Sequence, residues 1–209
     1  LVGYLLSVAV STRLADSWSI RVLSEFEKAF AAEHPQTEIR HRDPNAIPHL
    51  SHLELTAGRT PLDKHSAELS AAFALGNELS DELLGASAIV IATPMHNWGP
   101  PSALKAWIDR IINVKTFYRD SPALHGIPVT FIVASAGPYT RPDFIAHDHL
   151  RPLLREVFSR IGAQDMLFID CDPTGPLDRG EITPDRPESA WQKVLPSIPP
   201  AARRIKHPA

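Results

Sequence analysis

The sequence is poor in cysteine: its 209 residues contain only Cys171, so no internal disulfide can form. Unpaired cysteine is usual in a reducing compartment, and we therefore expect a cytoplasmic protein. Cys171 ends the apolar run MLFIDC. That position favours a buried, unreactive thiol over a catalytic one.

Long hydrophobic runs and an excess of basic residues are also missing. No stretch approaches the roughly 18 consecutive apolar residues of a membrane-spanning helix, so we expect no membrane partner. The opening LVGYLLSVAVS lacks the basic segment and cleavage site of a signal peptide and is expected to form a strand. The formal net charge is −3, whereas nucleic-acid binding requires a basic surface, so no nucleic-acid partner is expected.

Two common phosphate-binding motifs are absent. The chain contains neither G-x-x-x-x-G-K-[ST] nor G-x-G-x-x-G, which removes support for nucleotides held through a pyrophosphate. A local group of metal-binding residue types does occur at His147, Asp148 and His149. Because neighbouring side chains on a helix diverge, we expect no metal site there.

What the sequence does contain is an alternation of strand-like and helix-like segments. Apolar runs predict strands at residues 4–10, 37–42, 88–92, 128–134 and 165–170. Helical periodicity predicts helices at residues 19–33, 66–84, 102–114 and 143–161. This alternation predicts an α/β fold: a flavodoxin-like, doubly wound, five-stranded parallel sheet of order 2-1-3-4-5 with helices on both faces. The polar second strand is expected at an edge.

Two segments fit neither pattern. Residues 43–62 are expected to form a long connection interrupted by prolines, and residues 173–209 are also rich in proline. We therefore expect a flavodoxin-like domain over residues 1–172 and a proline-rich C-terminal extension over residues 173–209, extended on the surface or partly disordered. Gly85 is expected to end its helix in the left-handed conformation.

In such a sheet, ligands bind beyond the carboxyl ends of the strands, where the strand order reverses. The first loop at this place, STRLADSWS, precedes a helix. Hydroxyls of Ser11, Ser17 and Ser19, the guanidinium of Arg13 and the free N–H groups of the helix are suited to bind a phosphate. The alternative is that Ser17 or Asp16 only caps the helix.

The second and third loops suggest a binding place for a flat ring. In TPMHNWGP, Met95 and Trp98 offer apolar surface, Pro94 stiffens the turn, and Asn97 and Gly99 allow a ligand close to the backbone. Alternatively, Met95 and Trp98 belong to the core. The third loop, SAGPYTR, adds small residues and a tyrosine. One phosphate and one planar ring fit FMN better than any other common cofactor.

These elements resemble a known family. The S-x-R and S-x-S groups of the first loop, P-M-x-N-[FW] followed by LKxWID, a TFxY-like element at residues 116–118, and residues 150–169 are similar to the FMN-dependent NADH azoreductases, a family of flavodoxin-like quinone reductases. The resemblance implies a homodimer with FMN at the subunit interface. It also implies a two-step reaction in which NADH or NADPH reduces FMN, and FMN then reduces a small aromatic acceptor, a quinone or azo compound.

The resemblance assigns roles to individual residues. It implies that the phosphate is bound by Ser11, Ser17, Trp18 and Ser19, and that the ring is bracketed by Met95, His96, Asn97 and Trp98. It places Asn97 at the reactive edge, His96 beside it, and Ser135 and Gly137 at the pyrimidine end. His96 is then either a proton donor or a packing residue at the flavin rim.

The chain also departs from the family pattern. His96 replaces a usual Tyr or Phe, and Pro138 follows Gly137 where the family has a glycine-rich turn. These departures leave a second hypothesis open, a pathway-specific flavoenzyme that acts on an aromatic polyketide or similar quinone-like metabolite. A flavodoxin-type electron carrier and a flavin-free interaction protein are further alternatives.

Overall fold

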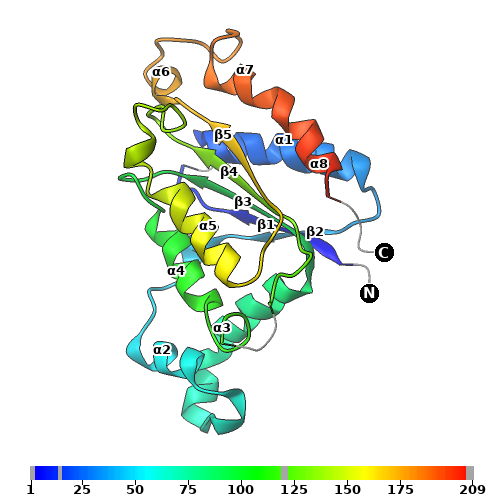
Figure 1. Ribbon diagram of the computed structural model, residues 1–209, viewed down its shortest axis with the longest axis vertical. Coiled ribbons are helices and arrows are strands. Elements are labelled where there is room, and N and C mark those ends of the chain that lie inside the picture. Colours follow the sequence, from blue (N-terminus) through cyan, green and yellow to red (C-terminus); the bar gives the residue numbers. More distant parts are fainter. Residues whose placement is uncertain (1–2, 14–15, 119–121, 206–209) are drawn as a thin grey trace.

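The computed structural model of the chain describes residues 3–13, 16–118 and 122–205. Five strands form one parallel sheet of order β2-β1-β3-β4-β5, which confirms the predicted fold class (Figure 1). The strands are β1 (Tyr4–Ala9), β2 (Ile39–Arg42), β3 (Ala86–Pro94), β4 (Val129–Ala134) and β5 (Met166–Cys171). The short, polar β2 lies at one edge of the sheet, as its sequence predicts.

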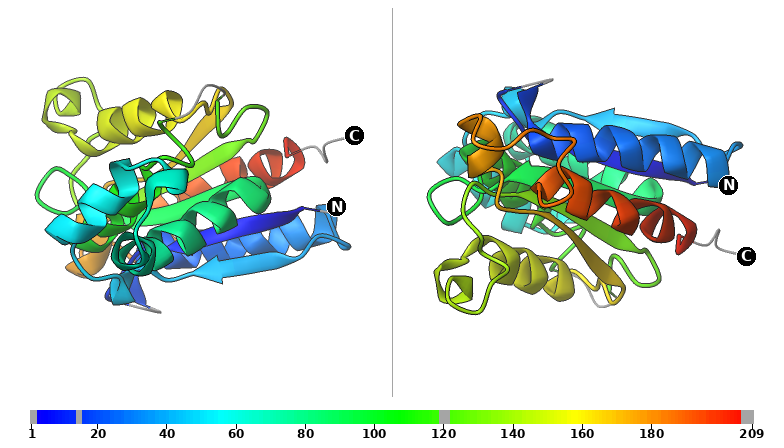
Figure 2. Two further views of the ribbon diagram at one scale, coloured as in Figure 1. Left: turned by 90° about the horizontal axis from the view of Figure 1, so that it is seen from below. Right: turned by 90° about the horizontal axis from the view of Figure 1, so that it is seen from above.

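Helices cover both faces of the sheet (Figures 1 and 2). One face carries α3 (Ala67–Gly85), α4 (Ser102–Ile111) and α5 (Leu150–Arg160), and the other carries α1 (Trp18–Glu33), α7 (Ala190–Val194) and α8 (Ile198–Arg203). Alternate residues of β1 divide between the two cores: Leu6 and Val8 pack toward α3 and α4, while Leu5 packs toward α1. The central strands are therefore buried on both sides, as in other parallel sheets. No helix of the described ranges combines the length and apolarity needed to cross a bilayer.

The connection over residues 43–62 contains a helix that the sequence analysis missed. It holds α2 (His52–Arg59), with short turns η2 (Pro44–Ala46) before it and η3 (Leu62–Lys64) after it. The local signal was present, because Ser51 and Glu54 form a capping box in which each side chain bonds the other residue's backbone N–H.

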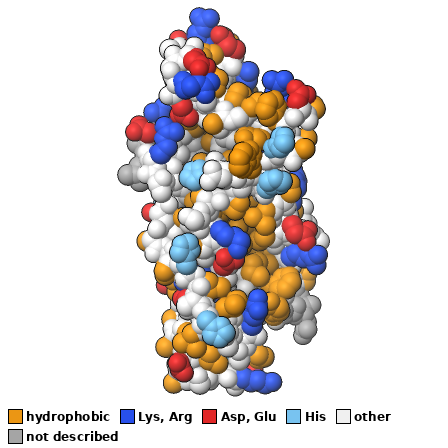
Figure 3. Space-filling model, turned by 90° about the vertical axis from the view of Figure 1, so that its left-hand side faces the viewer, with side chains coloured by type: hydrophobic (Ala, Val, Ile, Leu, Met, Phe, Trp, Pro, Cys, Tyr) orange, Lys and Arg blue, Asp and Glu red, His pale blue; other side chains and the backbone are white. Residues whose placement is uncertain are grey.

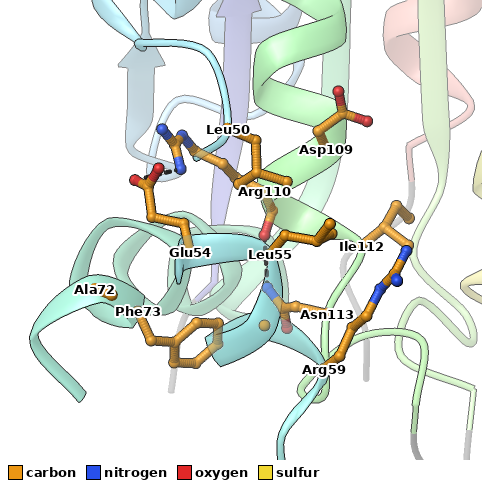
Figure 4. A pocket seen from close by; sticks show the side chains of 12 residues that line it. Leu50, Glu54, Leu55, Arg59, Ala72, Phe73, Asp109, Arg110, Ile112 and Asn113 are labelled. Atoms are coloured by element: carbon orange, nitrogen blue, oxygen red, sulfur yellow. Dashed lines mark hydrogen bonds and ion pairs between the residues drawn. The ribbon is translucent and has the colours of Figure 1, made fainter. Parts of the chain in front are cut away.

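A buried ion pair fixes this connection to the rest of the molecule (Figure 4). The guanidinium of Arg110 on α4 pairs with Glu54 at 2.7 Å and donates to the carbonyl of Pro48 at 3.0 Å. Burial opposes ionisation, yet hydrogen bonds from Ser51 and Arg110 lower the pKa of Glu54. The pocket beside this pair has a volume of about 20 Å³, enough for about one water molecule. The ion pair between Arg110 and Glu54 therefore has a structural role.

The predicted start of one helix was wrong, and so was the predicted backbone conformation at the end of another. Helix α5 begins at Leu150, not at residue 143, because Asp148 accepts hydrogen bonds from the N–H groups of Leu150 and Arg151 and so caps the helix there. Gly85 ends α3 without adopting a left-handed conformation. A side chain at Gly85 would lie 3.0 Å from the hydroxyl of Tyr4, so the close approach of that ring favours glycine there.

The C-terminal segment is neither extended nor peripheral, which corrects the expectation drawn from its prolines. It forms α6 (Gly175–Asp178), α7, the turn η5 (Leu195–Ser197) and α8. Pro176, Pro196 and Pro199 stand in the first turns of α6, η5 and α8, where the backbone N–H has no partner within the helix. Val194, Ile198 and Ala202 are buried in the core formed with α1. The division of the chain at residue 172 stays a prediction.

Replacing Ile198 with Ala tests whether this segment stabilises the whole molecule. The side chain is 2% exposed, so its truncation should lower the free energy of unfolding by about 2–4 kcal/mol in a single urea transition. Lys193→Ala, at an exposed position on the neighbouring α7, is the control and should change stability by less than about 0.5 kcal/mol. An unchanged main transition in Ile198→Ala would mean that residues 173–205 fold separately.

Candidate functional site

The carboxyl ends of β1, β3 and β4 lie at one edge of the sheet, and the three expected loops meet there. Pro94 pairs with Ala134, and the N–H of Met95 donates to the carbonyl of Ala134 at 2.8 Å. Figure 3 shows this edge, where hydrophobic side chains gather with histidines among them. The parallel register thus brings the second and third loops side by side.

The first loop leaves the start of α1 without a side-chain cap. Ser17 occupies the N-cap position but makes no capping hydrogen bond, and its hydroxyl lies 3.0 Å from that of Ser19. Ser11 is also buried, and its hydroxyl accepts from the N–H of Arg13 at 3.2 Å. Capping by Ser17 therefore does not explain this loop. The buried hydroxyls and the positive end of the helix dipole remain suited to an anion.

A cavity of about 130 Å³ opens in front of this helix end. Residues from the first and second loops line it together, namely Ser11, Arg13, Ser17, Trp18, Pro94, Met95 and His96. Ala134, Ala136, Thr174 and Asp178 complete the lining. Seven of the predicted site residues therefore share one cavity.

The second loop is a tight two-residue turn. His96 and Gly99 exchange both backbone hydrogen bonds, at 3.0 and 2.9 Å. Asn97 and Trp98 between them have φ angles of 47° and 66°, the left-handed values of a type I′ turn. Left-handed backbone is unfavourable for Trp, so the surrounding structure must hold it. The N–H of His149 does so in part by donating to the carbonyl of Trp98 at 2.9 Å.

This turn and the third loop face each other across a second cavity of about 220 Å³. Its lining comprises Met95, Asn97, Trp98, Ser135, Ala136, Gly137 and Tyr139. Trp98 is 55% exposed, so it is not a core residue, whereas Met95 packs partly against the core. A side chain at Gly137 would approach the ring of Tyr139 to 2.8 Å, so glycine is needed there.

Comparison with known proteins identifies the family. The chain matches the family model described as "Flavodoxin-like fold" over residues 4–195. An FMN-dependent NADH:quinone oxidoreductase of Nostoc punctiforme is 32% identical over 176 residues, which cover 80% of this chain and 86% of that protein. One from Frankia casuarinae is 34% identical over 179 residues, with coverages of 82% and 84%. The chain belongs to this flavodoxin-like family of quinone oxidoreductases.

Solved structures share the fold. The FMN-dependent NADH-azoreductase from Bacillus anthracis str. Ames Ancestor, in complex with FMN, has a TM-score of 0.79 with 22% identity, covering 97% of this chain and 99% of that one. Another azoreductase from Bacillus anthracis, strain Sterne, has a TM-score of 0.81 with 18% identity. At these identities the likeness concerns the fold.

Some residues at the site of this family member could not be read from the sequence pattern. Thr174 and Asp178 line the first cavity, although they follow the last strand. The N–H of Thr174 donates to the carbonyl of Ser135 at 2.9 Å, and the N–H of Gly175 donates to the carbonyl of Ala136 at 3.1 Å. These two hydrogen bonds connect α6 to the third loop. No local signal marks these residues, because only the folded chain brings them to this edge.

A buried ion network supports the second loop. Arg151 at the start of α5 pairs with Asp148 at 2.9 Å and with Asp170 of β5 at 2.6 Å. Burial raises the pKa of the Asp170 carboxyl, against the attraction of Arg151. The guanidinium therefore stabilises two carboxylates that would otherwise be costly to bury. The network fixes Asp148, and the N–H of the next residue, His149, donates a hydrogen bond to the carbonyl of Trp98.

Arg151→Met should leave both carboxylates without a cation and lower the free energy of unfolding by about 3–5 kcal/mol. Arg160→Met removes an exposed ion pair from the same helix and should cost less than about 1 kcal/mol. Urea denaturation of both variants measures the difference. Equal stability of the two variants would contradict the role assigned to Arg151.

Cys171 is a buried free thiol, as predicted. Burial, followed by the charges of Asp172 and Asp170, raises its pKa from 9.0 to about 12. A thiol nucleophile requires the thiolate, so this cysteine is unreactive in the native protein.

Iodoacetamide at pH 8 should therefore modify Cys171 rapidly only after unfolding. Because folding raises this pKa, the thiol leaves stability unaffected below about pH 9 and lowers it as the pH rises from 9.0 toward 12, where only the unfolded chain ionises. Comparing wild type with Cys171→Ala by denaturation at pH 7 and pH 10 isolates this effect. Fast alkylation of the native protein would refute the assignment.

Proposed function

We propose that this chain is an FMN-dependent NAD(P)H oxidoreductase that reduces quinones or azo compounds in two steps. One observation carries the proposal: the uncapped start of α1, with its buried serine hydroxyls, opens into a cavity that it shares with Met95 and His96. A phosphate site and a ring site are thus adjacent. The names of the curated relatives support FMN and NADH as cofactor and electron donor.

The donor set of the first loop fits a phosphate. The hydroxyls of Ser11 and Ser17, the guanidinium of Arg13 and the backbone N–H groups from Trp18 onward would bind it. The hydroxyl of Ser19 is buried against Ser17 and does not line this cavity, so Ser19 would contribute through its backbone N–H. A carboxylate in the first turn of α1 would repel a phosphate, and none is present there. The binding energy of the phosphate would anchor the cofactor and set the position of its ring.

The ring would lie between the second and third loops. Met95, Asn97 and Trp98 would contact it on one side, and Ser135 and Gly137 would contact its polar end. Pro94 sets the direction in which the chain leaves β3. Bound FMN supplies the chemistry, because it accepts a hydride from the nicotinamide and passes two electrons to the acceptor. The protein would supply the orientation of the ring.

His96 is suited to act on the acceptor. Its side chain is exposed and lines both the first cavity and an open recess that also contains Asn97, Lys105 and His149. Histidine exchanges protons near neutral pH, so His96 would donate a proton to a reduced quinone oxygen while Asn97 orients the reacting edge. Because this chain has His96 where the family has Tyr or Phe, its acceptor pocket is more polar than that of other family members.

We further infer that the active form is a homodimer with the site at the subunit interface. Trp98, Phe144 and Ile145 are 55%, 38% and 59% exposed. Trp98 borders the ring cavity. The carbonyl of Trp98 accepts a hydrogen bond from the N–H of His149, which follows Ile145 by four residues. Large apolar side chains beside a binding cavity favour burial by a second subunit.

The single buried cysteine supports a reducing compartment, the cytoplasm.

Anaerobic titration of the FMN-reconstituted protein tests the function. NADH or NADPH should bleach the visible flavin band, and a simple quinone should restore it. His96→Phe should keep FMN bound but slow the quinone step by about 10²-fold, the usual contribution of an acid catalyst, while leaving bleaching unchanged.

The other hypotheses predict different results. Bound flavin that nicotinamide cannot bleach would favour the pathway-specific flavoenzyme suggested by His96 and Pro138. Reduction only by a partner reductase would favour an electron carrier. Protein that binds no flavin would favour an interaction protein and contradict the proposal.

A further inference from the structure

The mouth of the first cavity contains a carboxylate that the reaction does not require. Asp178 ends α6, and its Oδ1 accepts from Nη1 and Nη2 of Arg13, each at 3.2 Å, and from Nε1 of Trp18 at 3.1 Å. Among the described residues that line this cavity, Arg13 is the only Arg or Lys, and Asp178 is the only carboxylate. The acid therefore neutralises the one guanidinium of the anion site and occupies two of its donors.

We propose that Asp178 is an internal competitor for the cofactor phosphate and thereby sets the preference between phosphorylated and unphosphorylated flavins. This inference rests on the proposed function. A phosphate bound at the start of α1 would meet the negative charge of Asp178 and would have to take over the fork of Arg13. Asp178 thus weakens the binding of ligands that carry a phosphate, and it leaves binding through the ring unaffected.

The geometry indicates that Asp178 competes with a phosphate for Arg13 and is not a fixed structural support for Arg13. The side chains of Arg13 and Asp178 are 57% and 26% exposed, and ion pairs this open to solvent contribute little stability. The start of α6 is anchored independently, because Thr174 and Gly175 donate backbone hydrogen bonds to the third loop. The carboxylate can consequently leave Arg13 by side-chain rotation while α6 stays in place.

Affinities for FMN and riboflavin test the proposal, because the two ligands differ only in the phosphate. Flavin fluorescence titration should show that Asp178→Asn binds FMN about tenfold more tightly than wild type, with riboflavin affinity unchanged. The gain should shrink as salt is raised. Glu181→Gln is the matched control: it removes a carboxylate from the same segment, one that pairs with Arg179 and does not line the cavity. It should change neither affinity.

Asp178→Ser, which lacks the amide, separates charge from hydrogen bonding and should show the same gain for FMN. Unchanged riboflavin affinity demonstrates that a variant retains the ring site. If Asp178→Asn binds FMN no more tightly than wild type, the proposal is overturned, and weaker binding would make Asp178 a support for Arg13 and Trp18. If wild type binds neither flavin, the proposed function fails, and this inference fails with it.

Discussion

The parallel pairing of β1, β3 and β4 is the constraint on which the site depends. Parallel strands end at the same edge, so loops that follow Ala9, Pro94 and Ala134, far apart in the sequence, must emerge together. In this chain the pairing of Ala9 with Ala92 and of Pro94 with Ala134 fixes their relative heights. A shift of the first register would separate the serine loop from the turn at Asn97, and a shift of the second would separate that turn from the third loop. The buried apolar strands, which stabilise the fold, therefore also determine where ligands can bind.

The C-terminal segment adds a second layer to this arrangement. Its helices α7 and α8 complete the core against α1, which stabilises the helix whose start is the phosphate site. Its first helix, α6, is tied by backbone hydrogen bonds to the third loop and carries Asp178 to the cavity. Stability and site chemistry are thus coupled: the same segment buries apolar surface and contributes a carboxylate to the anion site.

The sequence was sufficient for the sheet and the three loops, because apolar runs and helical periods are local signals. It placed a turn after the third strand, but the left-handed backbone of Asn97 and Trp98 within that turn is visible only in the structure. It failed where the determinant was distant or ambiguous: Asp178 reaches Arg13 only through tertiary structure, and Pro176 and Pro199 stand in the first turns of helices instead of preventing them. The capping box at Ser51 and Glu54 was readable and would have identified α2.

The central claim is that one cofactor spans the start of α1 and the space between the second and third loops. The most direct test is a crystal structure of the complex with FMN. The account predicts the phosphate within hydrogen-bonding distance of the hydroxyls of Ser11 and Ser17 and of the N–H groups that open α1, with the ring between residues 95–98 and 135–137. A phosphate bound away from α1, or a ring outside those two loops, would contradict it.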